Sequence, residues 1–432
     1  MSINASNNAP SDFKGIENNF IGGIWKDYPF FYTNYGNLQL DIVGFLAVLG
    51  EGSVLANAQV STLSSLIYIP RLLPAPQALL RPTRPSRLPT ESGTVSGVFS
   101  GNKRDYVNYI GHLVLDAEKM PDYSVRCVEI KRAKEGKTVR ATTFGPQSLL
   151  AVFGCIESLF LLGLAISYRD GMAIIAVLLL SLLSTLVGIG NKWQLRLHKR
   201  TADKAKAAPN GDVVIRYPRG NFLIVQCTEE VARELYFAPE AIEYLIRNSH
   251  AYRLISLVGT MMIMFGVITL ANAQIQLQLA FAPCYILLNA AYWVVAALPS
   301  KLHWDTSCYE IAKQRFSHSE YFHEKTFMDG NTTFTKALWK AIIATKRIGW
   351  VKHSQATPNS KAWDAWLLQA LEQANTANFY VNSDGVKVWE VPNWDAQGYL
   401  TGLLANPDYA EVASTMTMEI PVEDAMAGSE RC

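Results

Sequence analysis

The chain has 432 residues and a formal net charge of +2, with 39 Lys and Arg against 37 Asp and Glu. Hydrophobic residues make up 49%, but charged residues only 18%, whereas soluble domains average about 25%. This composition excludes an intrinsically disordered chain, and without a basic excess we expect no nucleic-acid partner. The low charge content does not by itself establish a membrane protein, because an average hides where the charges are missing.

Residues 1–98 form an N-terminal region with weak signals. The first 37 residues lack the basic and apolar segments of a secretory signal peptide. Residues 53–69 are mildly apolar but contain Asn57, Gln59 and several Ser and Thr residues, so two interpretations stay open. They are either a fifth membrane span, which would place the sequon at Asn4 outside the cytosol, or a buried or interfacial segment.

Residues 70–98 are predicted to be a linker. Six prolines and four arginines lie between positions 70 and 89, and proline both removes backbone donors and fixes φ. The stretch 82–87 has the PxxPxR spacing of an SH3-domain ligand, which would give the chain a cytosolic protein partner. The alternative is a cationic tether beside anionic lipid headgroups.

Residues 147–190 and 253–298 are each predicted to form a transmembrane helical hairpin. Residues 148–167 hold one charge, Glu157, and residues 171–190 hold none. No charge occurs between 254 and 298, where a polar turn separates helices expected at 254–273 and 277–298. About 20 helical residues cover the ~30 Å hydrocarbon core, so we expect four spans in a lipid bilayer.

Basic residues gather near the ends of these hairpins. Six lie between positions 126 and 140 and six between 192 and 206, whereas the first hairpin's turn carries only Arg169 beside Asp170. The positive-inside rule therefore places residues 99–146, 191–252 and 299–432 in the cytosol. The fold class is an α-helical integral membrane protein with cytosolic α+β modules.

The first two cytosolic segments show strand and helix patterns. β-rich runs predict β-hairpins at 125–144 and at 212–227, the latter turning at residues 218–221. Thr228 fits an N-cap for a helix that follows, and a second helix is expected to begin at Pro239.

The third cytosolic segment contains further helices and a hairpin. Residues 334–350 predict a basic amphipathic helix, which fits a membrane surface, a calmodulin-like partner or packing on its own domain. Trp363 and Trp366 mark another amphipathic helix, and residues 379–391 a hairpin. The acidic end of the chain is expected to be a disordered tail.

Glu157 and Asn289 are the candidate functional residues within the spans. A carboxyl halfway along a spanning helix is costly unless it faces other helices, where it could bind a proton, a cation or a basic ligand. The structural alternative is a hydrogen bond to Ser181, Ser184 or Thr185 across the hairpin. Asn289 in the fourth span is a possible partner.

Other chemistry has little support. His318 and His323 lie five positions apart, which differs from the i, i+4 spacing of a helical zinc motif, so no metal site is expected. His112 and Asp116 fit the surface of an amphipathic helix. The six cysteines are scattered without a CxxC, and no phosphate-binding or nucleophile motif occurs, so we expect no cofactor and assign no catalytic residue.

Three runs carry a resemblance to a known family: residues 128–154, the GIGNKW at 188–193 and the VARELY at 231–236. Over about residues 110–250 the chain resembles a group of fungal multipass membrane proteins that have no assigned activity. The resemblance implies an accessory role in a secondary-metabolite pathway, and it carries over no catalytic residue.

The leading functional hypothesis is a non-catalytic scaffold or accessory factor that presents cytosolic modules. The competing hypothesis is a membrane enzyme or small-molecule carrier that uses Glu157, and enzymatic activity is left open. Four helices are few for a carrier, so that hypothesis requires a homo-oligomer. Ser184 and Gly188, one turn apart, could seat contacts between copies.

Overall fold

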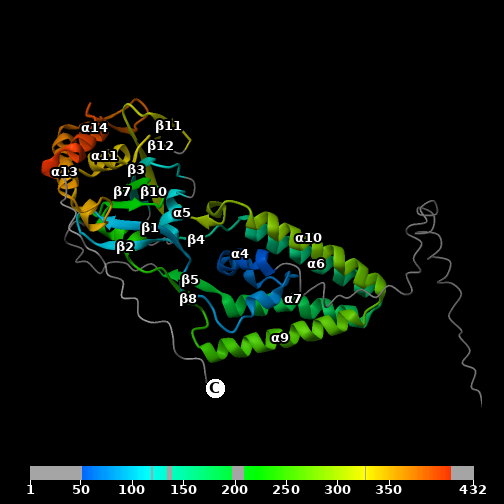
Figure 1. Cartoon of the computed structure of the whole chain (residues 1–432). Coiled ribbons are helices and arrows are strands. Elements are labelled where there is room, and N and C mark those ends of the chain that lie inside the picture. The colour runs from blue at the N-terminus through cyan, green and yellow to red at the C-terminus, as the bar shows by residue number, and fades with distance from the viewer. Residues whose placement is uncertain (1–50, 118–119, 134–138, 197–208, 326, 410–432) are drawn as a thin grey trace, which may run out of the picture.

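The computed structural model describes residues 51–117, 120–133, 139–196, 209–325 and 327–409. The structure has four long apolar helices, which extend from one side of an α/β domain (Figure 1). The predicted acidic tail after residue 409 and the sequon at Asn4 lie outside the described residues.

The four predicted spans are confirmed as helices long and apolar enough to cross a membrane. They are α6 (Pro146–Ser167), α7 (Gly171–Asn191), α9 (Ser249–Ala271) and α10 (Ile275–Ala296). Helix α9 begins five residues earlier than predicted, because the Asn248 side chain accepts a hydrogen bond from the His250 N–H and caps it.

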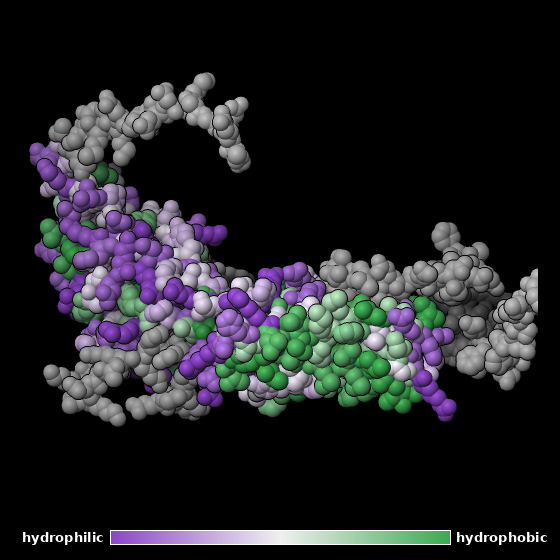
Figure 2. Space-filling model, turned by 90° about the horizontal axis from the view of Figure 1, so that it is seen from below, coloured by the Kyte–Doolittle hydropathy of each residue, from purple (hydrophilic) through white to green (hydrophobic). Residues whose placement is uncertain are grey.

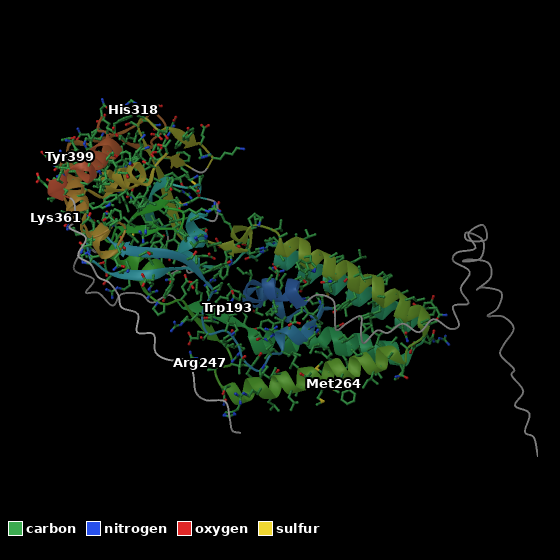
Figure 3. The ribbon with its side chains drawn as sticks, viewed as in Figure 1. Trp193, Arg247, Met264, His318, Lys361 and Tyr399 are labelled. Atoms are coloured by element: carbon green, nitrogen blue, oxygen red, sulfur yellow. The ribbon has the colours of Figure 1, made fainter. Side chains whose placement is uncertain are left out.

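The outward surface of these helices is apolar. Phe160, Leu178, Met264 and Leu287 are among the large hydrophobic side chains that are 42–59% exposed. Figure 2 shows the resulting apolar band, bounded by hydrophilic residues beside the α/β domain and at the far turns. Met264 projects outward from α9 (Figure 3). A surface of this extent fits lipid rather than water, so we call α6, α7, α9 and α10 the membrane helices.

Asp170 joins the two far turns. Its carboxylate accepts hydrogen bonds from the N–H groups of Met172 and Ala173, which caps α7, and from the Gln274 N–H at 2.7 Å. Burial opposes ionisation, but these three backbone donors lower the pKa of Asp170. The carboxylate therefore fastens one helical hairpin to the other.

The membrane helices separate toward the α/β domain. There α6 pairs with α10 and α7 with α9, and helix α4 (Glu51–Leu63) with the 3-10 turns η3 (Ser65–Tyr68) and η4 (Pro76–Leu79) lies between the two pairs (Figure 1). We call residues 51–80 the wedge segment. Helix α4 has 13 residues, about 20 Å, and is not among the candidate spans. The alternative of a buried segment is therefore correct, and the fifth span is wrong.

The predicted linker at 70–98 is also not an extended tether. The N–H groups of Arg71 and Leu72 donate to the carbonyls of Ser181 and Gly154, each at 3.3 Å, inside the membrane helices. The Ala75 N–H donates to the Tyr285 hydroxyl at 2.7 Å. Backbone groups buried among apolar helices need such partners. At the other end of the predicted linker, residues 90–97 form a strand.

One mixed sheet organises the α/β domain. Its main path runs in the order β13-β14-β10-β3-β7-β6-β1-β2, with β3 parallel to β7 and β10 parallel to β14. The short strands β11 and β12 pair beside β3. The strands are β1 (Thr90–Gly97), β2 (Lys103–Asn108), β3 (Val125–Arg132), β6 (Val213–Arg216), β7 (Phe222–Gln226), β10 (Tyr309–Phe316), β11 (Tyr321–His323), β12 (Met328–Gly330), β13 (Phe379–Val381) and β14 (Lys387–Trp389).

Two of the three predicted hairpins are confirmed. Strands β6 and β7 pair around Gly220, whose φ of +72° suits glycine, and β13 pairs with β14 around Gly385 at +73°. The hairpin at 125–144 is wrong. Strand β3 pairs instead with β7, β10 and β12, and β4 (Arg140–Ala141) with β9 (Trp304–Asp305). The side chains of Val125, Cys127, Val128 and Ile130 on β3 are buried by helices on both faces of the sheet, which places β3 at its centre.

Helices cover both faces of the sheet. On one face lie α5 (Tyr109–Leu115), α8 (Glu229–Ala232) and the π-turn η5 (Arg233–Phe237), with Thr228 at the predicted N-cap position. On the other lie α11 (Phe334–Thr345), α12 (Gly349–His353), α13 (Lys361–Thr376) and α14 (Ala396–Ala405). The predicted modules are thus one domain built from three segments of the chain.

Helix α11 lies in the core of that domain. Most of its side chains are buried, including Lys340, which pairs with buried Asp329. The predicted helix at 334–350 ends at 345, where Lys346 adopts a left-handed conformation. The structure therefore shows the third alternative, packing on its own domain.

The predicted helix at Pro239 is wrong. Residues there form β8 (Ala241–Tyr244), which pairs with β5 (Trp193–Arg196) directly after α7. The short pairs β5–β8 and β4–β9, with the 3-10 turn η6 (Ser300–Leu302), connect the membrane helices to the domain. A last 3-10 turn, η7 (Pro407–Tyr409), ends the described chain.

Candidate functional site

Glu157 lies on α6, in the interior of the membrane helices. The residue is 6% exposed, and its Oε2 atom has no hydrogen-bond partner in the described part of the chain. The carboxyl group lies within electrostatic range of the Cys284 thiol on α10. The prediction that Glu157 faces other helices is therefore correct.

The hydroxyl partners predicted for Glu157 are wrong. Ser181 bonds to Ser158, the Ser184 hydroxyl donates to the Ile69 carbonyl, and the Thr185 hydroxyl donates to the Tyr68 carbonyl. The wedge segment thus provides the acceptors for the Ser184 and Thr185 hydroxyls, whereas Ser181 bonds within the first helical hairpin. The surface at Ser184 and Gly188, predicted to contact a second copy, is covered by the wedge segment of the same chain. A side chain added at Gly188 would meet the Ile67 carbonyl at 2.8 Å.

Asn289 lies on α10 and holds the wedge segment. Its Oδ1 accepts a hydrogen bond from the Ser53 hydroxyl at 3.2 Å. One turn away, Asn57 of α4 donates to the Tyr292 carbonyl at 3.2 Å and accepts from Gln147 of α6. Among the described residues no hydrogen bond joins Asn289 to Glu157, so the two candidates do not form one site.

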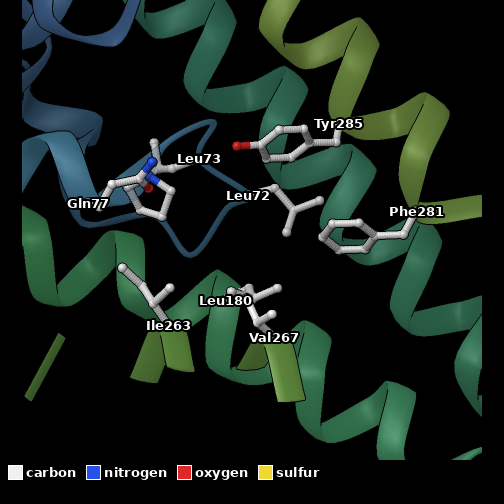
Figure 4. A pocket seen from close by; sticks show the side chains of 9 residues that line it. Leu72, Leu73, Gln77, Leu180, Ile263, Val267, Phe281 and Tyr285 are labelled. Carbon is white, nitrogen blue, oxygen red and sulfur yellow. The ribbon is translucent and has the colours of Figure 1, made fainter. Parts of the chain in front are cut away.

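A small cavity remains inside the membrane helices, where Leu72 reaches toward Phe281 and Tyr285 (Figure 4). It measures about 30 Å³, room for about one water molecule, whereas small-molecule pockets measure about 300–1,000 Å³. Glu157 is not one of its lining residues. This cavity is therefore too small for a substrate.

Two larger grooves lie on the α/β domain, on either side of the β6–β7 turn. They measure about 670 and 650 Å³ and share Tyr217, Pro218 and Arg219. In the first, His112 Nδ1 lies 3.0 Å from the Tyr217 hydroxyl, and burial raises the pKa of that tyrosine. Asn221 lines the same groove and its buried Oδ1 has no described partner.

The sequence did not reveal these grooves. The turn at residues 218–221 was visible as a local signal, but His112 was predicted to lie on the surface. It is instead 7% exposed, because Tyr217, more than 100 positions away, covers it. No signal in either segment links the two.

The described residues offer no metal site. They contain no group of three or more His, Cys, Asp and Glu side chains close enough to hold an ion. His318 and His323 are both exposed, at a turn and on β11 (Figure 3 labels His318). The thiol of Cys127 is fully buried, which raises its pKa to about 12 and makes it a poor nucleophile at neutral pH.

No family model, curated protein or solved structure matches this chain. Its class is therefore defined by architecture: four helices long and apolar enough to cross a membrane, joined to a large mixed sheet covered by helices. The resemblance to the fungal multipass family stays a prediction.

Proposed function

We propose that this chain is a non-catalytic scaffold or accessory factor that holds one α/β domain in a fixed position at the cytosolic surface of a membrane. The observation that carries this proposal is the wedge segment, which occupies the space between the two pairs of membrane helices. Membrane helices whose interior is packed by their own chain are suited to anchoring, and the cavity of about 30 Å³ beside the wedge segment is too small for a substrate.

The junction between the two parts supports a rigid attachment. Trp193, the first residue of β5, is 1% exposed and belongs to the same core cluster as the sheet. Its indole N–H donates to the Gln59 carbonyl of α4 at 2.9 Å, and its ring lies 6.2 Å from that of Trp304. A continuous core fixes the orientation of the domain, which a flexible tether would not do.

The two grooves beside Arg219 are the surface we propose the scaffold presents. The Arg219 side chain is 74% exposed, and its ion pair with Asp122, at 3.7 Å, is solvent-accessible and therefore weak. The guanidinium is thus available to an acidic group on a cytosolic partner. Fungal secondary metabolism, implied by the resemblance, is the setting in which we would seek that partner.

Two variants separate the scaffold from a carrier. Each variant is expressed in a strain from which this protein has been removed. If the protein is a scaffold, Glu157→Gln should restore the wild-type phenotype and Arg219→Glu should not. A carrier predicts the reverse, because it needs the carboxyl group and not the groove. The measurement is complementation by each full-length variant at matched membrane abundance.

Exposed Glu372 on α13 provides the matched control, as Glu372→Gln. It should complement under either hypothesis. Loss of function in Glu157→Gln at normal abundance, with Arg219→Glu fully active, would refute the scaffold.

The second candidate is a carrier or proton-coupled enzyme. One observation favours it: the Glu157 Oε2 atom has no described partner, and unpartnered acids inside membrane helices are enriched at working sites. It is tested by reconstituting the full chain in liposomes that contain a pH-sensitive dye. A proton flux in the wild type that is lost in Glu157→Gln and retained in Glu372→Gln would establish the carrier. The scaffold proposal instead predicts no proton flux from the wild type or from either variant.

The proposed orientation has a separate test. In sealed vesicles with the cytosolic side outward, protease should remove a tag at the C-terminus and spare a tag inserted between residues 169 and 170. The positive-inside distribution is the physical reason. Protection of the C-terminal tag from protease would show that the orientation is opposite to the one proposed.

A further inference from the structure

A pocket of about 340 Å³ lies where the wedge segment, the membrane helices and the α/β domain meet. Asn191 at the end of α7 and Tyr252 in the first turn of α9 line it, so it lies at the boundary of the apolar band. Trp193 and Tyr244 also line it, and such aromatic side chains are typical of the headgroup level of a bilayer.

The lining of this boundary pocket is cationic. It includes Arg81 and Arg84 and no acidic side chain. The remaining lining is apolar toward the membrane helices, with Leu55, Ala78 and Leu79, and polar at the rim, with exposed Thr83. A positive, polar opening above an apolar floor matches the chemistry of an anionic amphiphile.

Arg84 provides a fixed charge. Its guanidinium is stacked between the rings of Tyr244 and Tyr252, 4.0 Å from each centroid. Two of its nitrogens donate to the carbonyls of Gly190 and Ile246, at 2.7 and 2.8 Å. The charge is therefore held in the pocket wall by both ring faces and both carbonyls.

Arg81 provides an exchangeable charge. Its side chain is 52% exposed and pairs with Glu51, itself 53% exposed, at 2.5 Å. Exposed ion pairs contribute little free energy, so a phosphate group can replace this carboxylate. The two arginines thus differ in role: one is positioned by the fold, and the other can turn toward a ligand.

We propose that the boundary pocket binds the headgroup of an anionic phospholipid from the leaflet on the side of the α/β domain. Arg81 contacts the phosphate, Arg84 supplies a fixed positive potential, and Leu55 and Leu79 contact the first carbons of the lipid. The bound lipid lies against α4, Trp193 and β8, so it joins the wedge segment to the domain. This site is independent of the scaffold proposal, because it does not involve Glu157 or Arg219.

The test uses the full-length chain in detergent and counts bound lipid by native mass spectrometry. The ligands are phosphatidylserine, phosphatidylcholine with the same acyl chains, and water-soluble glycerophosphoserine. We expect phosphatidylserine to bind best and Arg81→Gln to weaken it about fivefold, since one arginine near a headgroup contributes about 1 kcal/mol. Glu51→Gln, which frees Arg81, should strengthen binding.

Arg169→Gln is the matched control, because Arg169 is exposed at the far turn, outside the pocket. It should bind phosphatidylserine like the wild type. Equal losses in Arg81→Gln and Arg169→Gln would show nonspecific attraction to charge and overturn the site. Equal binding of phosphatidylcholine, or competition by glycerophosphoserine at the lipid's own concentration, would overturn an anionic phospholipid as the ligand.

Ala58→Phe, which places a ring in the pocket, should abolish binding of phosphatidylserine. Melting temperatures without lipid show whether each variant folds. Should Ala58→Phe not fold, the opposite effects of Arg81→Gln and Glu51→Gln still decide the proposal, because both residues are exposed.

Discussion

Glu240 shows how burial sets the behaviour of a single carboxyl group outside the membrane helices. It is 5% exposed, and its Oε1 accepts a hydrogen bond from the Ile110 N–H at 2.8 Å, in the first turn of α5. Burial raises the pKa of Glu240 to about 7, although the backbone donors of α5 oppose this shift. The folded chain therefore binds this proton more tightly than the unfolded chain, whose glutamate pKa is about 4.3.

This shift predicts a pH dependence of stability. Where the folded state binds more protons, the free energy of unfolding falls as pH rises, here between about 4 and 7. Glu240→Gln keeps an oxygen acceptor for the Ile110 N–H and removes the ionisation, so its stability should fall less over that range. Denaturation of the detergent-solubilised chain at pH 5, 6, 7 and 8 measures the difference.

Glu372→Gln is the control for this experiment, because Glu372 is exposed. It should keep the wild-type slope. Parallel curves for the wild type and Glu240→Gln would mean that Glu240 is already ionised in the folded protein at pH 5.

At the scale of elements, the wedge segment packs against helices at glycines. A side chain at Gly154 of α6 would meet the Leu72 carbonyl at 2.9 Å, and one at Gly188 of α7 would meet the Ile67 carbonyl at 2.8 Å. These close approaches explain why an irregular backbone can lie between apolar helices. Because glycine has no side chain, the wedge backbone can come close to α6 and α7. At that distance the hydroxyls of α7 can donate hydrogen bonds to the wedge carbonyls.

Gly154→Leu should therefore displace the wedge segment. We expect a loss of about 1–3 kcal/mol in stability, the usual cost of overpacking, and new protease cleavage within residues 64–80. Gly163→Leu is a matched control on the same helix, since nothing lies within 4 Å of a side chain added at Gly163. Equal melting temperatures and equal cleavage for the two variants would contradict this packing.

At the scale of the whole molecule, the α/β domain and the membrane helices share one junction. Trp193 links α4, through Gln59 and Thr62, to the sheet core, through Trp304. Figure 3 places Trp193 between the domain and the membrane helices. A buried aromatic side chain shared by two parts makes their unfolding cooperative, because neither part can open without exposing it.

Trp193→Ala should separate the two parts thermally. The wild-type chain should melt in one transition, and the variant in two, with a loss of about 3–5 kcal/mol at the junction from the cavity left behind. Scanning calorimetry in detergent measures this. Trp350→Ala, in the domain core away from the junction, should lower stability without dividing the transition; a single transition in both variants would disprove the coupling.

The sequence alone determined the features that depend on neighbouring residues. The four membrane helices follow from uninterrupted hydropathy, and the β6–β7 and β13–β14 hairpins follow from apolar runs joined at a glycine turn. The burial of Glu157 among helices followed from the cost of a carboxyl group in a membrane. Each of these signals lies within about 25 consecutive residues, so no knowledge of distant segments was needed.

Only the tertiary structure decided what depends on contacts between distant segments. Arg71, Pro74 and Pro76 have the composition of a linker, yet they are buried because Gly154 and Ser181, 80 to 110 positions away, offer carbonyls and space. Strand β3 pairs with β7 and β10 rather than with the residues that follow it in sequence. Both partner strands come from other segments of the chain, so no local pattern could reveal the pairing. The low charge content of 18% is thus an average over charge-poor membrane helices and a charged domain. Its distribution along the chain determined the membrane helices, but not what fills the space between them, because that depends on contacts between distant segments.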